Sequence, residues 1–234
     1  MDLWASFLQL LNSLGMQAGG ETAQRVGQAA AQLDTAHLLA LAAALGWASG
    51  LRLYAVVFLT GLAGATGLLA LPPGLQVLQH PALLTGSGVL LFVEFFVDKI
   101  PGLDSLWDLT HSVLRIPAGA ALAAAVFGAD SATMAMLAAL LGGTLAASSQ
   151  AAKTTTRAAI NTSPEPFSNL LASVVEDSLV VAALWLSVKQ PLLFGILLAL
   201  AVVLLAALTW QLFRFLRAAL RRLLAFFGTR AGAA

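Results

Sequence analysis

Residues 88–119 read GVLLFVEFFVDKIPGLDSLWDLTHSVLRIPAG, and this stretch decides the fold because it sets ionisable side chains in a sequence apolar enough for a bilayer. Its ionisable residues are Glu94, Asp98, Lys99, Asp104, Asp108, His111 and Arg115. An ionisable group at membrane depth costs about 2.5–3.5 kcal/mol even on permissive insertion scales. Such groups usually face protein or water inside the membrane, so the stretch predicts a polar site.

The spacing of these residues predicts two helices with charged faces. On a helix that begins near residue 103, positions i, i+4, i+7 and i+11 return to one side. Those positions are Asp104, Asp108, His111 and Arg115. Glu94 and Asp98 are one turn apart on the preceding helix, and residues 100–102, Ile-Pro-Gly, predict a tight break between the two helices.

The composition is that of an integral membrane protein. Of the 234 residues, 59% are hydrophobic and only 10% are charged, whereas a soluble domain has about 25% charged residues. The net charge of +1 gives no reason to expect nucleic acid as a partner. The chain contains no cysteine, which excludes disulfides and thiolate chemistry, and no basic region precedes its first apolar run as in a signal peptide.

Apolar runs of sufficient length predict an all-α polytopic membrane protein with about six spans, some of them broken or re-entrant. The spans are expected at residues 36–63, 82–98, 104–127, 132–152, 167–188 and 192–213. We expect the third to be interrupted at residues 117–119, Pro-Ala-Gly, and to begin as a re-entrant half-helix. The transmembrane domain thus covers residues 35–213, between amphipathic N-terminal interfacial helices in 1–34 and a basic amphipathic tail in 214–234.

The distribution of basic residues predicts the orientation through the positive-inside rule. Six spans with both termini in the cytoplasm of a bacterium, and the protein in its inner membrane, leave only one basic residue in an outside loop, Lys189. The basic residues placed inside are Arg25, Lys99, Lys153, Arg157 and the C-terminal arginines.

Residues 36–128 and 132–213 form a candidate inverted repeat of three spans each. In both segments the first span combines a Gly/Ser patch with basic residues, and the second carries acids. The residues concerned are Ser49, Gly50, Arg52, Glu94 and Asp98, then Ser148, Ser149, Lys153, Arg157, Glu176 and Asp177. Inverted repeats with interrupted helices frame a central site in many transporters.

Charges at membrane depth do not balance. Seven acids are Glu94, Asp98, Asp104, Asp108, Glu165, Glu176 and Asp177, and five bases are Arg52, Lys99, Arg115, Lys153 and Arg157. A surplus of two negative charges would be neutralised by protonation, by His111 or by a bound cation, which favours a proton- or cation-linked mechanism. The alternative is a structural salt-bridge lattice that locks the broken helices together.

Basic residues with polar neighbours also form a candidate site for an anion or a phosphate headgroup. Arg52, Lys153, Arg157 and Asn161 combine bidentate guanidinium donors with neutral ones. Positive-inside anchoring explains Lys153 and Arg157 equally well, but it does not explain Arg52.

A metal site and an enzyme have weaker support. Asp104, Asp108 and His111 have a ligand-like helical spacing, but Arg115 and Lys99 would compete for the same carboxylates, so no metal is assigned. The chain has neither GxSxG nor HExxH, and no catalytic residue or cofactor is assigned.

Three stretches carry a family resemblance: SGLRLYAVVFLTGL, EFFVDKIPGLDSLWDLTHSVLRIPAGA and KTTTRAAINTSPEPFSN, which begin at residues 49, 94 and 153. The chain resembles an uncharacterised family of prokaryotic integral membrane proteins, domain of unknown function 4126, over most of residues 38–200. The resemblance implies a shared membrane fold, and no activity. It implies that the family pattern includes Glu94, Asp98, Lys99, Pro101, Asp104, Asp108, Arg115 and Pro117.

The leading functional hypothesis is a small transporter or flippase-like protein for an anionic solute or lipid headgroup, coupled to protons or another cation. The residues expected to bind substrate or ion are Arg52, Glu94, Asp98, Lys99, Asp104, Asp108, His111, Arg115, Lys153, Arg157, Asn161, Glu176 and Asp177. One alternative is a non-transporting scaffold or assembly protein, and another is a metal-dependent intramembrane lipid enzyme. Membrane lipids are expected partners, and the small-residue sequences AGAALAAAVFG and ALLGG suit either a homodimer or packing within one chain.

Overall fold

The computed structural model describes residues 34–100, 102–128, 131–161 and 166–231. This part of the chain is all-α, without strands, as predicted. The elements are α3 (Thr35–Ala65), the 3₁₀-helix η1 (Pro73–Gln79), α4 (Pro81–Val97), α5 (Leu103–Phe127), α6 (Ala132–Ile160), α7 (Pro166–Lys189) and α8 (Pro191–Ala231). The predicted interfacial helices in residues 1–33 lie outside the described residues.

The number of membrane spans agrees with the prediction. Five described helices are long and apolar enough to cross a membrane, namely α3, α5, α6, α7 and the first part of α8. η1 and α4 form a pair bent by 68° that raises the number to six if the pair is one span. The chain is therefore a polytopic membrane protein.

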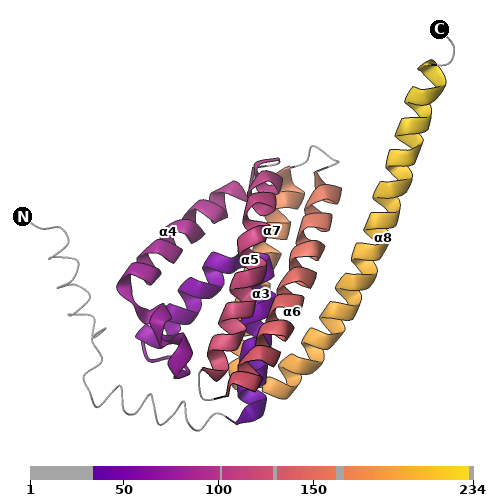
Figure 1. Cartoon of the computed structure of the whole chain (residues 1–234). Coiled ribbons are helices and arrows are strands. Elements are labelled where there is room, and N and C mark those ends of the chain that lie inside the picture. The colour runs from indigo at the N-terminus through magenta and orange to yellow at the C-terminus, as the bar shows by residue number, and fades with distance from the viewer. Residues whose placement is uncertain (1–33, 101, 129–130, 162–165, 232–234) are drawn as a thin grey trace, which may run out of the picture.

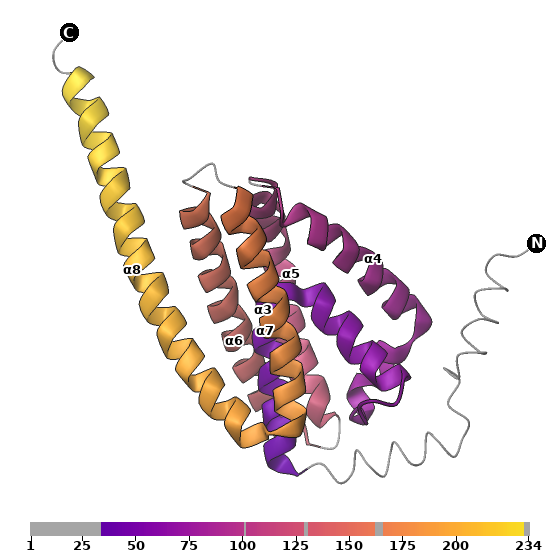
Figure 2. The same ribbon diagram turned by 180° about the vertical axis from the view of Figure 1, so that it is seen from behind.

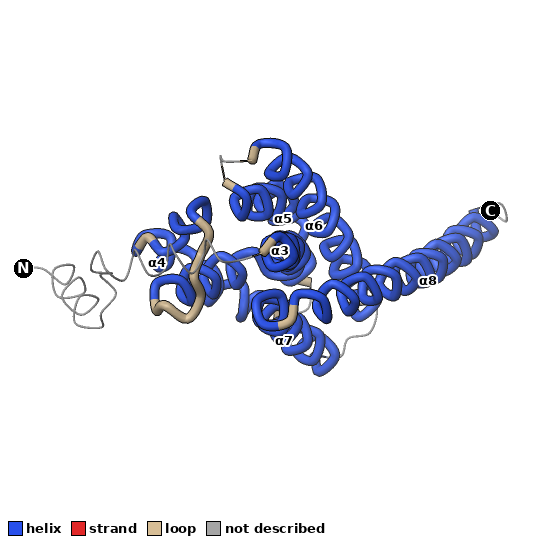
Figure 3. Tube along the Cα trace, turned by 90° about the horizontal axis from the view of Figure 1, so that it is seen from below, coloured by secondary structure: helices blue, strands red, loops and turns tan. Residues whose placement is uncertain are grey.

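α3 lies at the centre of the bundle. Seen along the bundle in Figure 3, the other helices surround it, with α5 and α6 on one side and α4 and α7 on others. Its residues 40–53 are buried almost without exception. A helix buried all round needs an apolar, small-residue sequence, and the segment ALAAALGWASGL provides one.

α3 is broken at Arg52, whose backbone has φ −147° and ψ 84°. Its first half follows the bundle axis, and its second half turns away at the break and returns toward the end from which α3 started (Figures 1 and 2). α3 therefore contains a buried helix break near the middle of the bundle.

α5, in contrast, is continuous from Leu103 to Phe127 with Pro117 inside it, so the predicted interruption at Pro117 is wrong. Transmembrane helices tolerate an internal proline because neighbouring helices and local adjustments satisfy the freed backbone groups. The predicted break between α4 and α5 is present, and Gly102 there adopts φ 87°, a conformation that favours glycine.

Small residues allow α3, α5 and α6 to approach closely. A Cβ atom added to Gly142 of α6 would collide with Ala123 and Gly119 of α5, and one added to Gly46 of α3 would collide with the Gly142 backbone. The small-residue sequences that suggested a homodimer thus contribute to packing within the chain.

α8 differs from the other helices in leaving the bundle. It is a single helix from Pro191 to Ala231, so the domain boundary predicted at residue 213 is not a break in the backbone. In Figure 1 only its beginning lies against the other helices. α6, the counterpart of α3 in the proposed repeat, is unbroken, and the described structure gives the inverted repeat no support.

The two ends of the described chain are on opposite sides. The start of α3 and the C-terminal end of α8 lie at opposite ends of the bundle in Figures 1 and 2. The turn between α7 and α8 lies at the same end as the start of α3. The prediction of two cytoplasmic termini also involves residues 1–33, outside the described part, and it is not confirmed.

α3 begins with a side-chain cap outside the membrane-spanning part. Asp34 Oδ1 accepts a hydrogen bond of 2.9 Å from the His37 backbone N–H, one of the donors that a helix start leaves without a partner. The hydrogen bonds from the backbone and ring of His37 hold the pKa of Asp34 below its usual value.

Candidate functional site: a charge network at the break in α3

The break in α3 leaves a helix end inside the bundle, and a lysine from α6 donates a hydrogen bond to a backbone carbonyl at this end. The last carbonyls of a helix lack intrahelical donors and carry partial negative charge. Lys153 Nζ donates to the Leu51 backbone oxygen at 3.0 Å, one residue before the break. The lysine thus stabilises the broken end both as a hydrogen-bond donor and as a cation.

Arg52, at the break itself, joins α3 to α4 and α7. Its side chain is fully buried, with Nη2 2.9 Å from Asp98 Oδ2 and Nε 2.7 Å from Asp177 Oδ1. Nη2 also donates to Ser173 Oγ at 2.7 Å. A buried arginine in the middle of the bundle thus has carboxylate partners from both α4 and α7.

Arg115 joins α5 to α4 and α6. Its Nη2 lies 2.5 Å from Glu94 Oε1, and its Nη1 lies 2.7 Å from Asp108 Oδ1. Nη1 also donates to Gln150 Oε1 at 3.0 Å. Asp108 and Arg115 share a face of α5, as their spacing of seven residues predicts.

Lys153 connects the two arginine groups. Its Nζ is 3.1 Å from Asp108 Oδ1, 3.4 Å from Asp98 Oδ2 and 3.3 Å from Glu176 Oε2. One ammonium group thus faces carboxylates from α4, α5 and α7.

Arg157, one turn after Lys153 on α6, anchors the other end of the cluster. Its Nε and Nη2 approach the two oxygens of Glu176 at 3.2 and 3.1 Å, a bidentate pair. Its Nη1 donates to the Asn169 side chain at 3.1 Å and lies 3.8 Å from Asp104 Oδ2.

Asp104 has mostly neutral partners. Its oxygens accept hydrogen bonds from Asn161 Nδ2 at 3.1 and 3.2 Å and from the backbone N–H of Gly102 at 2.8 Å. Asn161 in turn accepts from Asn169 Nδ2 at 2.8 Å. These contacts tie the start of α5 to α6 and α7.

We refer to these ionisable residues together as the charge network. Its members are Arg52, Glu94, Asp98, Asp104, Asp108, Arg115, Lys153, Arg157, Glu176 and Asp177. All are buried except Asp177, whose side chain is 35% exposed. Helices α3 to α7 all contribute, and Asn161 lies at the edge of the network.

Two of the predicted site residues lie apart from the charge network. His111 stacks on Trp107 with ring centroids 3.9 Å apart and has Nδ1 2.9 Å from the Trp107 backbone oxygen. The long side chain of Arg115 extends back along α5 to Asp108, two turns earlier. Asp108 therefore pairs with Arg115 and not with His111. Lys99 is partly exposed, and its Nζ donates to the Phe95 carbonyl at 2.8 Å.

Neutral residues complete the network, for which the expected site residues included only one neutral residue, Asn161. Gln150 and Ser173 bind Arg115 and Arg52, and Asn169 binds Arg157. Each follows a helical spacing to a predicted ion: Gln150 is three residues before Lys153, and Asn169 and Ser173 precede Glu176 by seven and three. That spacing is the signal by which they could have been found. Glu165 lies outside the described residues.

The charge network has more carboxylates than cations. Six acids face four basic residues, a surplus of two negative charges. Three buried carboxylate oxygens accept no hydrogen bond from a described residue: Glu94 Oε2, Asp98 Oδ1 and Asp108 Oδ2. Buried polar atoms ordinarily have a partner, so each of these oxygens can carry a proton or face a cation.

The same geometry does not favour a metal site. Among the described residues no group of three or more potential ligands of the His, Cys, Asp or Glu type is placed to hold a metal ion. Arg115 Nη1 and Lys153 Nζ lie 2.7 and 3.1 Å from Asp108 Oδ1, whereas Lys99, the lysine expected to compete for these carboxylates, lies apart from them.

Comparison with known proteins identifies the family. A model described as Domain of unknown function (DUF4126) matches residues 39–211, which include every member of the charge network. No curated protein and no solved structure matches the chain significantly. The match confirms the resemblance that the three sequence stretches indicated, and the chain therefore belongs to the DUF4126 family of integral membrane proteins.

Proposed function

We propose that the protein is a small membrane transporter in which the charge network at the break in α3 binds a proton or another cation during transport. The observation that carries this proposal is the surplus of carboxylates in the charge network, six against four basic groups and all but Asp177 buried, beside a helix break. Broken helices in the middle of a bundle are a recurrent feature of ion and substrate sites in transporters.

The free-energy cost of placing ionisable residues inside a membrane protein supports a functional role for the network. Ionisable residues within membrane segments are expensive and commonly mark ion pathways or proton relays. Glu94, Asp98 and Asp108 each have one oxygen paired with a cation and one without a donor. A carboxylate in that position can take up and release a proton while its ion pair keeps the helices together.

The anionic substrate of the sequence hypothesis gains no support from this geometry. Arg52, Lys153 and Arg157 each lie within 4 Å of at least two carboxylates. An incoming anion would have to displace these carboxylates and would add to the negative surplus. We therefore propose a cation as the coupled or transported ion, in the inner membrane of a bacterium and with the C-terminal arginines in the cytoplasm.

Cation/proton exchange in reconstituted vesicles tests the proposal. Vesicles with an acidic lumen and a trapped pH-sensitive dye would receive sodium, potassium or tetramethylammonium on the outside. We expect at least one of these cations to raise the lumen pH in a protein-dependent manner, and Glu94→Gln to lose the response. Asp34→Asn, an exposed acid outside the network, is the control.

No response to any cation, or the same response in Glu94→Gln as in the unchanged protein, would contradict the proposal. Thermal unfolding of each variant in detergent would separate a loss of function from a loss of fold.

A second candidate function is that of a non-transporting scaffold. It is favoured by the basic side chains of the charge network, which join different helices. The single side chain of Arg52 links α3 to both α4 and α7, so the network also stabilises the fold. The scaffold predicts that single charge removals destabilise the protein and that no cation raises its unfolding temperature. Specific stabilisation by a cation, lost in Glu94→Gln, favours the transporter.

A further inference from the structure

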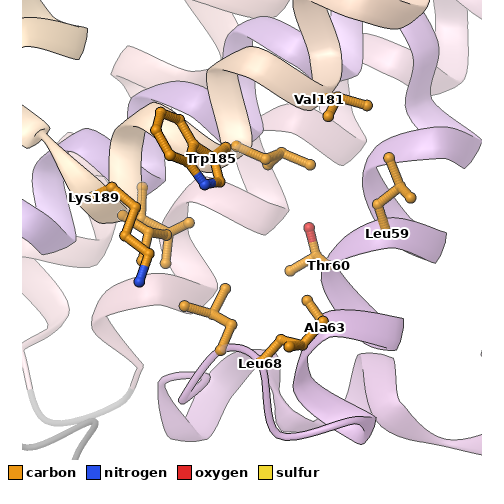
Figure 4. A pocket seen from close by; sticks show the side chains of 11 residues that line it. Leu59, Thr60, Ala63, Leu68, Val181, Trp185 and Lys189 are labelled. Carbon is orange, nitrogen blue, oxygen red and sulfur yellow. The ribbon is translucent and has the colours of Figure 1, made fainter.

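An apolar groove leads from one end of the bundle to the charge network. Three adjoining cavities of about 310, 390 and 610 Å³ lie along one face of α7, and Val181 lines all three. The second half of α3 forms the facing wall with Leu59 and Thr60, as Figure 4 shows for the first cavity. Phe92 of α4 lines the second cavity.

The groove exists because α4 and α7 scarcely touch. Both pack against α3, whose second half turns away at the Arg52 break and holds the two helices apart. Several side chains that line the groove are exposed, including Phe92 at 65%, Val181 at 54% and Trp185 at 58%. In a membrane this opening would face the lipid chains.

The groove extends along α7 from Lys189 to Asp177. Asp177, Val181, Trp185 and Lys189 follow at intervals of four residues and line one or more of the cavities. Twelve residues of helix correspond to about 18 Å, close to half of a hydrocarbon core of about 30 Å. The groove therefore has about the depth of one membrane leaflet.

The inner end of the groove is acidic. Asp177 lines two of the cavities and is the member of the charge network that the groove exposes. Its Oδ1 lies 2.7 Å from Arg52 Nε. With Asp177 included, the charge network has two more carboxylates than cations.

Resting on the function proposed above, we infer that this groove admits an amphiphilic cation from the bilayer. The ligand class is an amine or quaternary ammonium head on a single apolar chain, with the head at Asp177 and the chain between Leu59, Phe92 and Trp185. Charge complementarity selects this class, because a cationic head offsets the acidic surplus. An anionic head would increase the surplus, and a neutral head would leave it unchanged.

Quenching of Trp185 fluorescence by a brominated amphiphile tests the inference directly. The protein in lipid nanodiscs would be titrated with dodecyltrimethylammonium brominated on its chain, and with dodecyl maltoside brominated at the same position as the neutral control. We expect the ammonium probe to produce, at lower concentration, a saturable component of quenching that is absent in Trp185→Phe, where the other tryptophans remain. Asp177→Asn should weaken apparent binding by about tenfold through loss of a charge-assisted contact.

A matched pair of variants keeps the test independent of Asp177, which also pairs with Arg52. Val181→Phe narrows the groove and should abolish saturable quenching. Leu179→Phe, on the other side of α7 and also exposed, should not change it. Ser178→Cys lines the groove in this cysteine-free chain, and it should not form a crosslinked dimer.

Equal quenching by both probes, or no difference between Val181→Phe and Leu179→Phe, would mean that the groove is only a surface for membrane lipid and would overturn the inference. Crosslinking through Ser178→Cys would overturn it by showing that a second copy covers the groove. Absence of selective binding, with cation/proton exchange intact, contradicts only this inference. Selective binding without any effect of Glu94→Gln on exchange contradicts only the proposed function.

Discussion

At the scale of single residues, Arg52 shows why a charged side chain can be stable at the centre of a membrane protein. The guanidinium group of Arg52 forms ion pairs with Asp98 and Asp177 and donates a hydrogen bond to Ser173. Breaking a buried ion pair by removing one partner is costly because the other charge stays buried.

We therefore expect Arg52→Gln to lower the free energy of unfolding by about 3–5 kcal/mol, because Asp177 loses its ion-pair partner and Asp98 loses the nearest of its cations. Thermal or denaturant unfolding in detergent would measure the change. Arg214→Gln, an exposed arginine of α8, is the matched control and should leave stability unchanged. An Arg52→Gln protein as stable as the control would refute the structural part of this assignment.

For His111 and Lys99 we expect substitution to have little effect on stability or transport. Neither residue pairs with a carboxylate of the charge network, since His111 stacks on Trp107 and Lys99 covers Phe95. His111→Leu and Lys99→Gln should each cost no more than about 1 kcal/mol and retain cation/proton exchange in vesicles. Loss of exchange with an intact fold in either variant would return that residue to the functional set.

At the scale of helices, close contact between α3, α5 and α6 positions the network. The three backbones approach closely at Gly46, Gly119 and Gly142. Gly142→Leu should therefore destabilise the bundle by about 1–3 kcal/mol or more through overpacking. Gly195→Leu on α8 is the control, because a Cβ there meets no atom within 4 Å. Unfolding of the two variants in detergent would check the difference, and equal stability would contradict the packing.

The broken end of α3 makes a further prediction at this scale. Lys153 Nζ binds the Leu51 carbonyl as well as three carboxylates. Lys153→Met keeps the apolar stem but removes the cation, and we expect hydrogen exchange of residues near Leu51 to become faster. Lys189→Met, an exposed lysine on α7, should leave that exchange unchanged. Unaltered protection near Leu51 would show that the break does not depend on Lys153.

At the scale of the whole molecule, the break in α3 determines at which end of the bundle each end of the described chain lies. Because the second half of α3 turns back, the start of α3 and the end of α8 lie at opposite ends of the bundle (Figure 1). The absence of cysteine from the native chain makes this arrangement easy to test with single introduced cysteines.

We expect Gln190→Cys and Asp34→Cys to react with a membrane-impermeant maleimide in intact cells, and Arg214→Cys to react only after permeabilisation. The reason is that arginines concentrate on the C-terminal part of α8, which the positive-inside rule places in the cytoplasm. Labelling of Asp34→Cys and Arg214→Cys from the same side would support six complete spans instead.

Much of the fold follows from local sequence. The bounds of α4, α5 and α7 differ from the predicted spans by only one residue at most ends, because long apolar runs and Pro/Gly turns specify transmembrane helices locally. The position of the broken helix was predicted less well. Pro117 has a strong local signal but lies in a continuous helix, whereas Arg52, without proline, marks the break.

The sequence by itself determined that this is an all-α membrane protein whose acids and bases share helix faces, since hydropathy and helical period are local properties. Only the tertiary structure decided which charges meet. The carboxylate partners of Arg52 lie 46 and 125 residues away in the sequence. His111 has the helical spacing of the charged residues but stacks on Trp107 outside the network. The groove depends on how far apart α4 and α7 are held. Pairing of this kind depends on how the helices dock, and a helical period specifies the face of a residue but not its neighbour.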